Sequence, residues 1–147
     1  MSFIALSFIF LMACTASIPK LGLINKQLTP CPNKSNCVIS QITDKEHYIR
    51  PISFIGKPQD AQDRLLHILE TLDRTKIIAI QQNYIRVEFL SKIFKFVDDV
   101  EFHFPSTNTA QIVINFRSAS RIGYSDFGAN QKRIEQIREQ FNEYHLK

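Results

Sequence analysis

Hydrophobic and polar positions alternate along the middle of the chain, and this pattern predicts β-strands. Residues 84–90, 97–104 and 110–117 each place aliphatic and Phe side chains on one face and polar side chains on the other. Residues 76–82 hold three isoleucines and form a further strand candidate. Strands with one apolar and one polar face are typical of an antiparallel sheet that is covered on one side.

Two other stretches have helical spacing. Residues 58–73 begin at a proline, which suits the first turn of a helix, and carry a leucine stripe. Residues 127–144 form the second predicted helix, with Ser125 or Asp126 as its N-cap. The apolar stripes are Leu65, Leu66, Leu69 and Leu72 in the first helix and Phe127, Ile134, Ile137 and Phe141 in the second.

A looser strand over residues 48–55, which Pro51 places at a sheet edge, completes the order β-α-β-β-β-β-α. We therefore predict an α+β fold, with an antiparallel sheet of about five strands and two helices packed on one face. The length of 147 residues suits one such domain, and an apolar fraction of 44% excludes a disordered chain.

The N-terminal segment differs from the rest of the chain. Residues 1–13 are uncharged and almost all apolar, but a membrane-spanning helix needs about 20 residues. They fit the apolar region of a secretory signal. Leu11-Met12-Ala13-Cys14 resembles the lipobox of bacterial lipoproteins, which implies cleavage before Cys14 and lipid on that residue. An ordinary leader or a short N-terminal anchor are the alternatives.

This interpretation divides the chain into a signal peptide (1–13), a lipidated tether (14–30) and one α+β domain (31–147). Thr15 after the lipidated position indicates an exported protein held at the outer membrane and facing the periplasm. The net charge of +4 arises between residues 14 and 57, beside the expected anchor. Positive charge there is attracted to an anionic membrane surface, or it only keeps the tether solvated. No nucleic-acid partner is expected, because no extended basic cluster stands out.

Two cysteines remain after Cys14, in Cys31-Pro32-Asn33-Lys34-Ser35-Asn36-Cys37. In an exported domain such a pair indicates a disulfide, here within a stapled loop over residues 31–44. A redox pair usually has two intervening residues, and a zinc site needs four ligands. We therefore favour a structural disulfide over a redox site, a metal site or free thiols, and predict neither metal nor cofactor.

Two groups of polar residues are candidates for chemistry. The polar strand faces carry Arg86, Glu88, Asp99, Glu101, His103, Asn115 and Arg117, with Asp98 just before them. Carboxylates beside a histidine are suited to general acid–base work. Opposite charges that face each other on neighbouring strands also stabilise a sheet, by roughly 0.2–1 kcal/mol per pair. We expect a solvated salt-bridge face, with ligand contact and catalysis as alternatives.

The second group spans residues 117–130, where two glycines, three serines and two arginines connect a strand to a helix N-terminus. Helix N-termini attract anions, and Arg117 and Arg121 are able to add bidentate contacts. The alternative is a purely structural connection with glycines at positive φ and Ser or Asp as caps. No G-x-S-x-G, P-loop or H-E-x-x-H pattern is present.

At these residues the sequence resembles the domain of unknown function 1499 family. The resemblance is carried by Cys31-Pro32, Asn36-Cys37-Val38, Phe96-Val97-Asp98-Asp99-Val100-Glu101-Phe102, Arg117-Ser118-Ala119-Ser120-Arg121, Gly123, Ser125-Asp126, Gly128, Asn130 and Arg133-Ile134. It implies one site or polar network made of Asp98, Asp99, Glu101, Arg117, Ser118, Ser120, Arg121, Asp126, Asn130 and Arg133. A buried network that only fixes the fold gives the same pattern.

Three functional interpretations follow. The first is a non-catalytic binding domain for a small anionic or lipid-like ligand, or for an envelope protein, with a pocket lined by Arg117, Arg121 and Arg133. The second is a structural envelope component without a ligand. The third is a hydrolase or isomerase that uses Asp98, Asp99 or Glu101 as its base. We favour binding over the other two.

Overall fold

The computed structural model describes residues 17–41 and 45–144. Cys14, where lipidation is predicted, lies outside the described residues. The described chain has two helices and eight strands. In chain order they are β1 (Leu23–Ile24), β2 (Gln27–Leu28), β3 (Cys37–Ile39), β4 (Ile52–Ile55), α1 (Pro58–Thr71), β5 (Thr75–Gln81), β6 (Tyr84–Leu90), β7 (Val97–His103), β8 (Gln111–Ser120) and α2 (Ala129–Glu143).

The main sheet has six strands in the order β3-β8-β7-β6-β5, and β4 also pairs with β8. All strand pairs are antiparallel. The long strand β8 holds two short partners on the same edge: β4 opposite Gln111–Ile114 and β3 opposite Arg117–Ala119. The predicted α+β class and antiparallel sheet are confirmed. The additional strands are β1, β2 and β3, which precede the first predicted strand.

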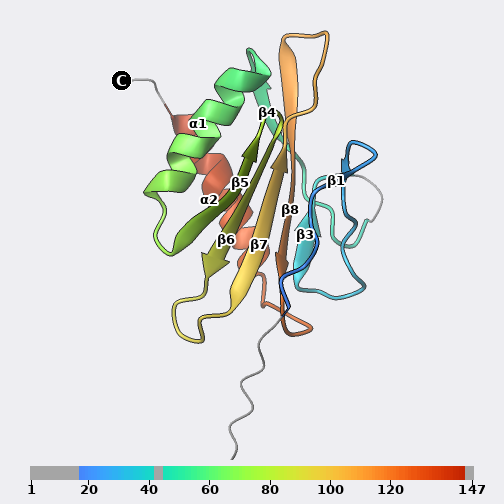
Figure 1. The fold of residues 1–147 in the computed structure, drawn as a ribbon, viewed down its shortest axis with the longest axis vertical. Coiled ribbons are helices and arrows are strands. Elements are labelled where there is room, and N and C mark those ends of the chain that lie inside the picture. The colour runs from blue at the N-terminus through green and yellow to red at the C-terminus, as the bar shows by residue number, and fades with distance from the viewer. Residues whose placement is uncertain (1–16, 42–44, 145–147) are drawn as a thin grey trace, which may run out of the picture.

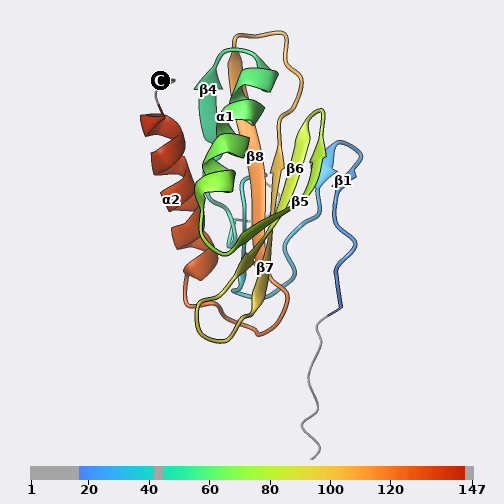
Figure 2. The ribbon, with the colours of Figure 1, turned by 60° about the vertical axis from the view of Figure 1, so that its left-hand side comes forward.

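Both helices cover one face of the sheet (Figure 1 and Figure 2). Their apolar stripes pack against the inward side chains of β6, β7 and β8, and Phe102, Phe104, Phe116 and Phe141 are all fully buried there. Burying a Phe or Leu side chain stabilises a fold by about 1.5–3 kcal/mol, so this layer supplies the main core. The helix layer leaves the opposite face of the sheet to be covered by another part of the chain.

The N-terminal segment covers that opposite face. β1 and β2 form a small two-stranded sheet, on the other side of the main sheet from the helices in both views. Leu28 is 3% exposed and packs in a second cluster with Ile39 and Tyr84. We expected residues 14–30 to be a tether without periodic structure. The prediction is wrong for the described part of that range, because β1 and β2 pair with each other and Leu28 is buried.

The prediction of a solvated salt-bridge face is also wrong, because the N-terminal segment covers this face of the sheet. Asp99, Glu101, His103 and Arg117 are between 0% and 7% exposed beneath this cover. Charged groups at such depth need partners, since an isolated buried charge is strongly unfavourable. The polar face is therefore an interior layer of the protein.

Several element boundaries differ from the prediction. The expected stapled loop contains β3, and β8 continues to Ser120, so residues 117–120 lie in a strand. α2 begins at Ala129 after Gly128, whose φ of 79° suits glycine. Phe127, predicted in the apolar stripe of this helix, precedes it and is 99% exposed. A local turn at residues 123–128 thus makes the helix begin two residues later than predicted.

Candidate functional site

The main sheet separates the ten predicted site residues into two networks. Successive side chains of a strand point to opposite faces, so Asp98 and Asp99 diverge. The network on the helix side contains Asp98, Ser118, Ser120, Asp126, Asn130 and Arg133, and the network on the opposite side contains Asp99, Glu101, Arg117 and Arg121. The expectation of a single site is therefore wrong.

Asn130 is the centre of the helix-side network. It is fully buried in the first turn of α2 and accepts hydrogen bonds from Ser118 Oγ (2.5 Å) and Arg133 Nη1 (2.6 Å). Its Nδ2 donates to the Asn36 carbonyl (3.0 Å) and to Ser120 Oγ (3.1 Å). One side chain thus joins α2, β8 and the segment before β3.

Asp126 satisfies the N-terminus of α2. Its carboxylate accepts hydrogen bonds from the backbone N–H groups of Gly128 (3.0 Å) and Asn130 (2.7 Å). These are the donors that an anion would use at a helix N-terminus. Gly128 occupies the N-cap position, but the Asp126 side chain accepts the hydrogen bonds that the predicted N-cap residue would accept. The same contacts argue against an anion site on these N–H groups.

On the opposite face, Asp99 holds two arginines. It accepts from Arg86 Nη2 (2.7 Å) and from Arg121 Nε (2.7 Å), and Arg121 also pairs with Glu88. Burial alone would raise the pKa of Asp99, but the hydrogen bonds from Arg121 and Arg86 outweigh it and hold this pKa below its ordinary value. The hydrogen bond to Asp99 in turn raises the pKa of Arg121. Asp99 is thus an ionised partner in a closed network.

Glu101 lies deeper on the same face. Its Oε1 accepts from the Tyr84 hydroxyl (2.7 Å) and from the Gly22 N–H (2.9 Å), and its Oε2 lies 3.6 Å from Arg117 Nη1. Burial raises the pKa of Glu101 in spite of Tyr84 and Arg117, and burial lowers the pKa of Arg117. Burial thus disfavours the charged form of both residues, so burying this pair lowers the free energy of unfolding. The Gly22 contact ties the N-terminal cover to the network.

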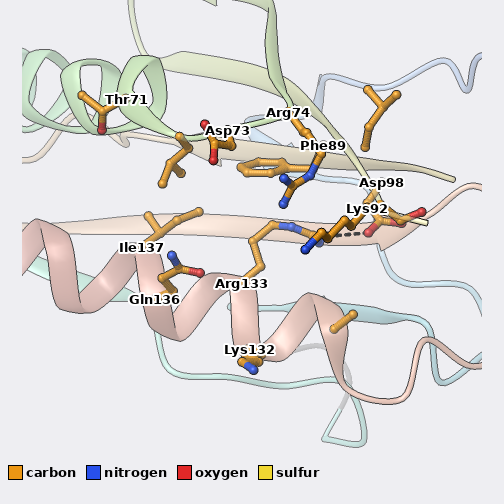
Figure 3. Close-up of a pocket in the computed structure, with 14 residues that line it drawn as sticks. Thr71, Asp73, Arg74, Phe89, Lys92, Asp98, Lys132, Arg133, Gln136 and Ile137 are labelled. Carbon is orange, nitrogen blue, oxygen red and sulfur yellow. Dashed lines mark hydrogen bonds and ion pairs between the residues drawn. The ribbon is translucent and has the colours of Figure 1, made fainter. Parts of the chain in front are cut away.

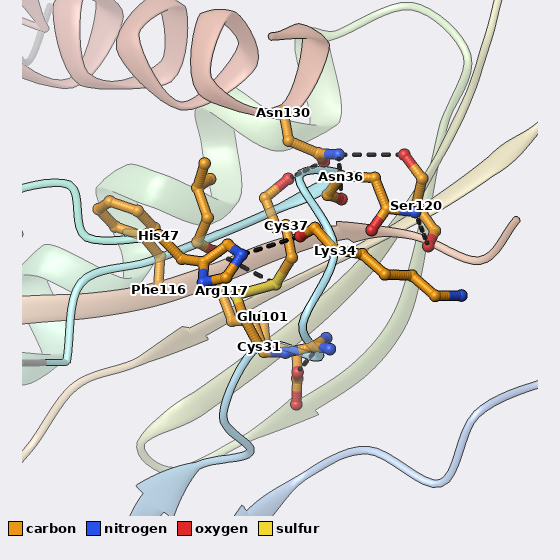
Figure 4. The surroundings of a disulfide bond; sticks show 12 residues. Cys31, Lys34, Asn36, Cys37, His47, Glu101, Phe116, Arg117, Ser120 and Asn130 are labelled. Atoms are coloured by element: carbon orange, nitrogen blue, oxygen red, sulfur yellow. Dashed lines mark hydrogen bonds and ion pairs between the residues drawn. A yellow bond between two sulfur atoms is a disulfide. The ribbon is translucent and has the colours of Figure 1, made fainter. Parts of the chain in front are cut away.

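The predicted disulfide is present between Cys31 and Cys37, with Cα atoms 5.8 Å apart. It joins the segment after β2 to the start of β3. Two carbonyls of this loop accept side-chain hydrogen bonds from outside it: that of Lys34 from His47 Nε2 (2.8 Å) and that of Asn36 from Asn130 (Figure 4). The staple therefore positions Asn36 for the helix-side network, which is a structural role.

A cleft of about 510 Å³ opens beside the helix-side network, between the first half of α2, the end of β6 and the turn that follows α1. The Phe89 ring, Leu72 and Ile137 contribute apolar surface to it. Arg133 crosses it, with its guanidinium 4.8 Å from the Phe89 ring centroid and 2.5 Å from Asp98 Oδ2. Figure 3 shows the ends of Arg74, Lys92 and Arg133 around the same opening.

The cleft is basic. Arg74, Lys92, Lys132 and Arg133 line it against Asp73 and Asp98. Among these six described residues, only Arg133 and Asp98 form an ion pair. Of the three arginines predicted to line a pocket, only Arg133 does so. Arg117 and Arg121 belong to the network across the sheet. Arg74, Lys92 and Lys132 were missed because no pattern along the sequence brings three separate segments together.

The geometry gives the predicted catalytic groups other roles. Asp98 and Asp99 are held in ion pairs, and Ser118 donates to Asn130. Ser118 and Ser120, the serines nearest these carboxylates in the sequence pattern, are not hydrogen-bonded to a histidine or carboxylate in the described part of the chain, as an activated nucleophile requires. Neither described helix has the length and apolar character needed to cross a membrane.

Comparison with known proteins adds the family. The family model described as "Protein of unknown function (DUF1499)" matches residues 27–141. This range includes both networks and the cleft and covers most of the chain, so the chain belongs to this family. No curated protein matches.

Proposed function

We propose that this member of the DUF1499 family is a non-catalytic binding domain, and that its ligand is a small anionic amphiphile held in the cleft beside α2. The observation that carries the proposal is an apolar floor next to cations without counter-ions. The half-buried Leu72 and the exposed edge of the Phe89 ring suit a short apolar body, and Arg74 and Lys92 suit an anionic head. The helix-side network holds Arg133 in place in this cleft, through Asn130 and Asp98.

The charges of the cleft favour an anion. The Asp98–Arg133 pair neutralises itself at the floor, whereas Arg74, Lys92 and Lys132 are exposed and form no ion pair within the described residues. A ligand head group with a negative charge gains contacts from these side chains. Each ionic contact at a partly exposed position is worth about 1 kcal/mol, which is about fivefold in Kd.

Titration of the purified chain with octyl phosphate tests the proposal, with octanol as the uncharged ligand of the same apolar length. Octyl phosphate is expected to bind at one site per chain and octanol to bind far more weakly. In Arg74→Gln/Lys92→Gln the Kd of octyl phosphate rises roughly 30-fold, from two contacts of about 1 kcal/mol.

A matched control removes two lysines away from the cleft. Lys57 and Lys76 are exposed and form no ion pair among the described residues, so Lys57→Gln/Lys76→Gln is expected to bind as the wild type. Equal affinity for octanol and octyl phosphate, or an equal loss in both double variants, contradicts the proposal.

We also propose that the chain is exported and anchored by lipid on Cys14 at the outer membrane, facing the periplasm. The support is the apolar segment 1–13, the Leu11-Met12-Ala13-Cys14 motif and Thr15. In a bacterial host, labelled palmitate is expected to enter the wild type and not Cys14→Ser. Equal labelling of both, or none in either, contradicts this anchor.

A further inference from the structure

Exposed apolar side chains gather on two loops at one end of the domain. The loop between β6 and β7 carries Ile93 (78% exposed) and Phe94 (70%), with Phe96 stacked on Phe94 at 5.3 Å between ring centroids. The turn between β8 and α2 carries Tyr124 (68%) and Phe127 (99%). β6 and β8 both run antiparallel to β7, so both loops lie at the same end of the strands, where β7 begins. We call residues 92–96 and 124–127 the aromatic end.

The aromatic end is accompanied by free positive charge. Lys92 and Lys95 flank Ile93 and Phe94, and both lysines are exposed without an ion pair in the described part of the chain. The acidic residue there, Asp126, is engaged by the Gly128 and Asn130 N–H groups. Alternating lysines and large apolar side chains suit an anionic bilayer, because the rings enter the head-group region while the lysines reach the phosphates.

The N-terminal end of the described chain lies at the aromatic end. The described chain begins, in blue, at the same end as the loop between β6 and β7 and the turn before α2, in both views (Figure 1 and Figure 2). Its sequence is preceded by the apolar segment 1–13. An anchor in that segment or at Cys14 therefore holds the aromatic end, and not the β4 end, toward the membrane.

We propose that the aromatic end docks on the surface of an anionic lipid bilayer, with Phe94 and Phe127 inserted among the head groups. The orientation rests on the proposed anchor, whereas the docking contacts are those of the folded domain. Large apolar side chains exposed together at one end of a folded protein indicate a site of interaction. The proposal gives residues 93–96 a role that the ligand cleft does not need, whereas Lys92 lies at the border of both surfaces.

The chain has no tryptophan, so single tryptophans report insertion without background. Full chains carrying Phe94→Trp, Phe127→Trp or Ile55→Trp are reconstituted into phosphatidylcholine–phosphatidylglycerol vesicles with brominated acyl chains. Ile55 is 81% exposed and pairs with Gln111, at the opposite end of β8. At about 3.3 Å per residue it lies roughly 30 Å from Ser120. Emission from positions 94 and 127 is expected to shift to the blue and to be quenched, and emission from position 55 is not.

The lysines supply a second readout. Each lysine near an anionic surface contributes about fivefold to the ratio of docked to undocked protein, so Lys92→Gln/Lys95→Gln in the Phe127→Trp background lowers that ratio roughly 30-fold. Lys57→Gln/Lys76→Gln is expected to leave it unchanged. Vesicle-bound protein without quenching at 94 and 127 overturns the docking proposal and indicates that the aromatic end faces a protein. Protein that does not bind the vesicles at all overturns the docking proposal together with the anchor.

Discussion

The buried pair of Glu101 and Arg117 offers a sharp test of the inner polar layer. Glu101 is 0% exposed and Arg117 is 7% exposed, and Oε2 of Glu101 lies 3.6 Å from Nη1 of Arg117. In Arg117→Met the carboxylate keeps Tyr84 and Gly22 but loses its counter-ion. Removing one partner of a buried pair costs about 3–5 kcal/mol, because the other charge remains without compensation.

Urea unfolding with a constant m-value measures this loss, and the melting temperature is expected to fall by roughly 10–15 °C. Arg74→Met is the matched control, since Arg74 is exposed and unpaired within the described residues, and it is expected to change stability by less than about 0.5 kcal/mol. Glu101→Leu/Arg117→Met removes both charges and is expected to cost less than Arg117→Met alone. A loss below about 1 kcal/mol in Arg117→Met is typical of an exposed pair and would refute the buried layer.

Three further predictions concern other parts of the fold. Burial lowers the pKa of His103 below 6.5, so the unfolded chain binds a proton more readily and stability falls as the pH drops through that value. His103→Gln is expected to flatten this dependence between about pH 7 and about pH 5 in urea titrations. Cys31→Ser/Cys37→Ser opens a seven-residue loop, closed at a sequence separation of 6, and is expected to cost about 2 kcal/mol by the same assay. Asn130→Ala leaves the Asn36 carbonyl and Ser118 without their partner and is expected to cost about 3 kcal/mol, seen as faster amide exchange across β3 and the first turn of α2. A flat profile in the wild type, an unchanged midpoint or unaltered exchange would contradict each in turn.

The sequence was informative where the periodicity is regular. β6 has the predicted bounds, and α1 and β7 differ only at their C-terminal ends, because burial of one face imposes a strict alternation or stripe. The disulfide was predicted from two cysteines close together in a chain that the N-terminal segment predicts to be exported. The resemblance selected residues that do form networks, but it grouped all ten together, whereas the sheet divides them between its two faces.

The wrong assignment of the polar sheet face to solvent has one cause, which is that the second cover of the sheet has no periodic signal. β1 and β2 have two residues each, too few for alternation to be recognised. Without that cover, the charged face over Asp99 and Glu101 had to be assigned to solvent. The cleft was missed for a related reason, because Arg74, Lys92 and Lys132 come from three turns or helices that meet only in the folded chain.

Native mass spectrometry of the chain purified from a bacterial envelope tests the central claim most directly. The account predicts one bound anionic amphiphile per chain, released on denaturation, and lost in Arg74→Gln/Lys92→Gln but retained in Lys57→Gln/Lys76→Gln. A bare chain that stays bare after addition of octyl phosphate, or an adduct retained equally in both double variants, would contradict the assignment of the cleft as the binding site.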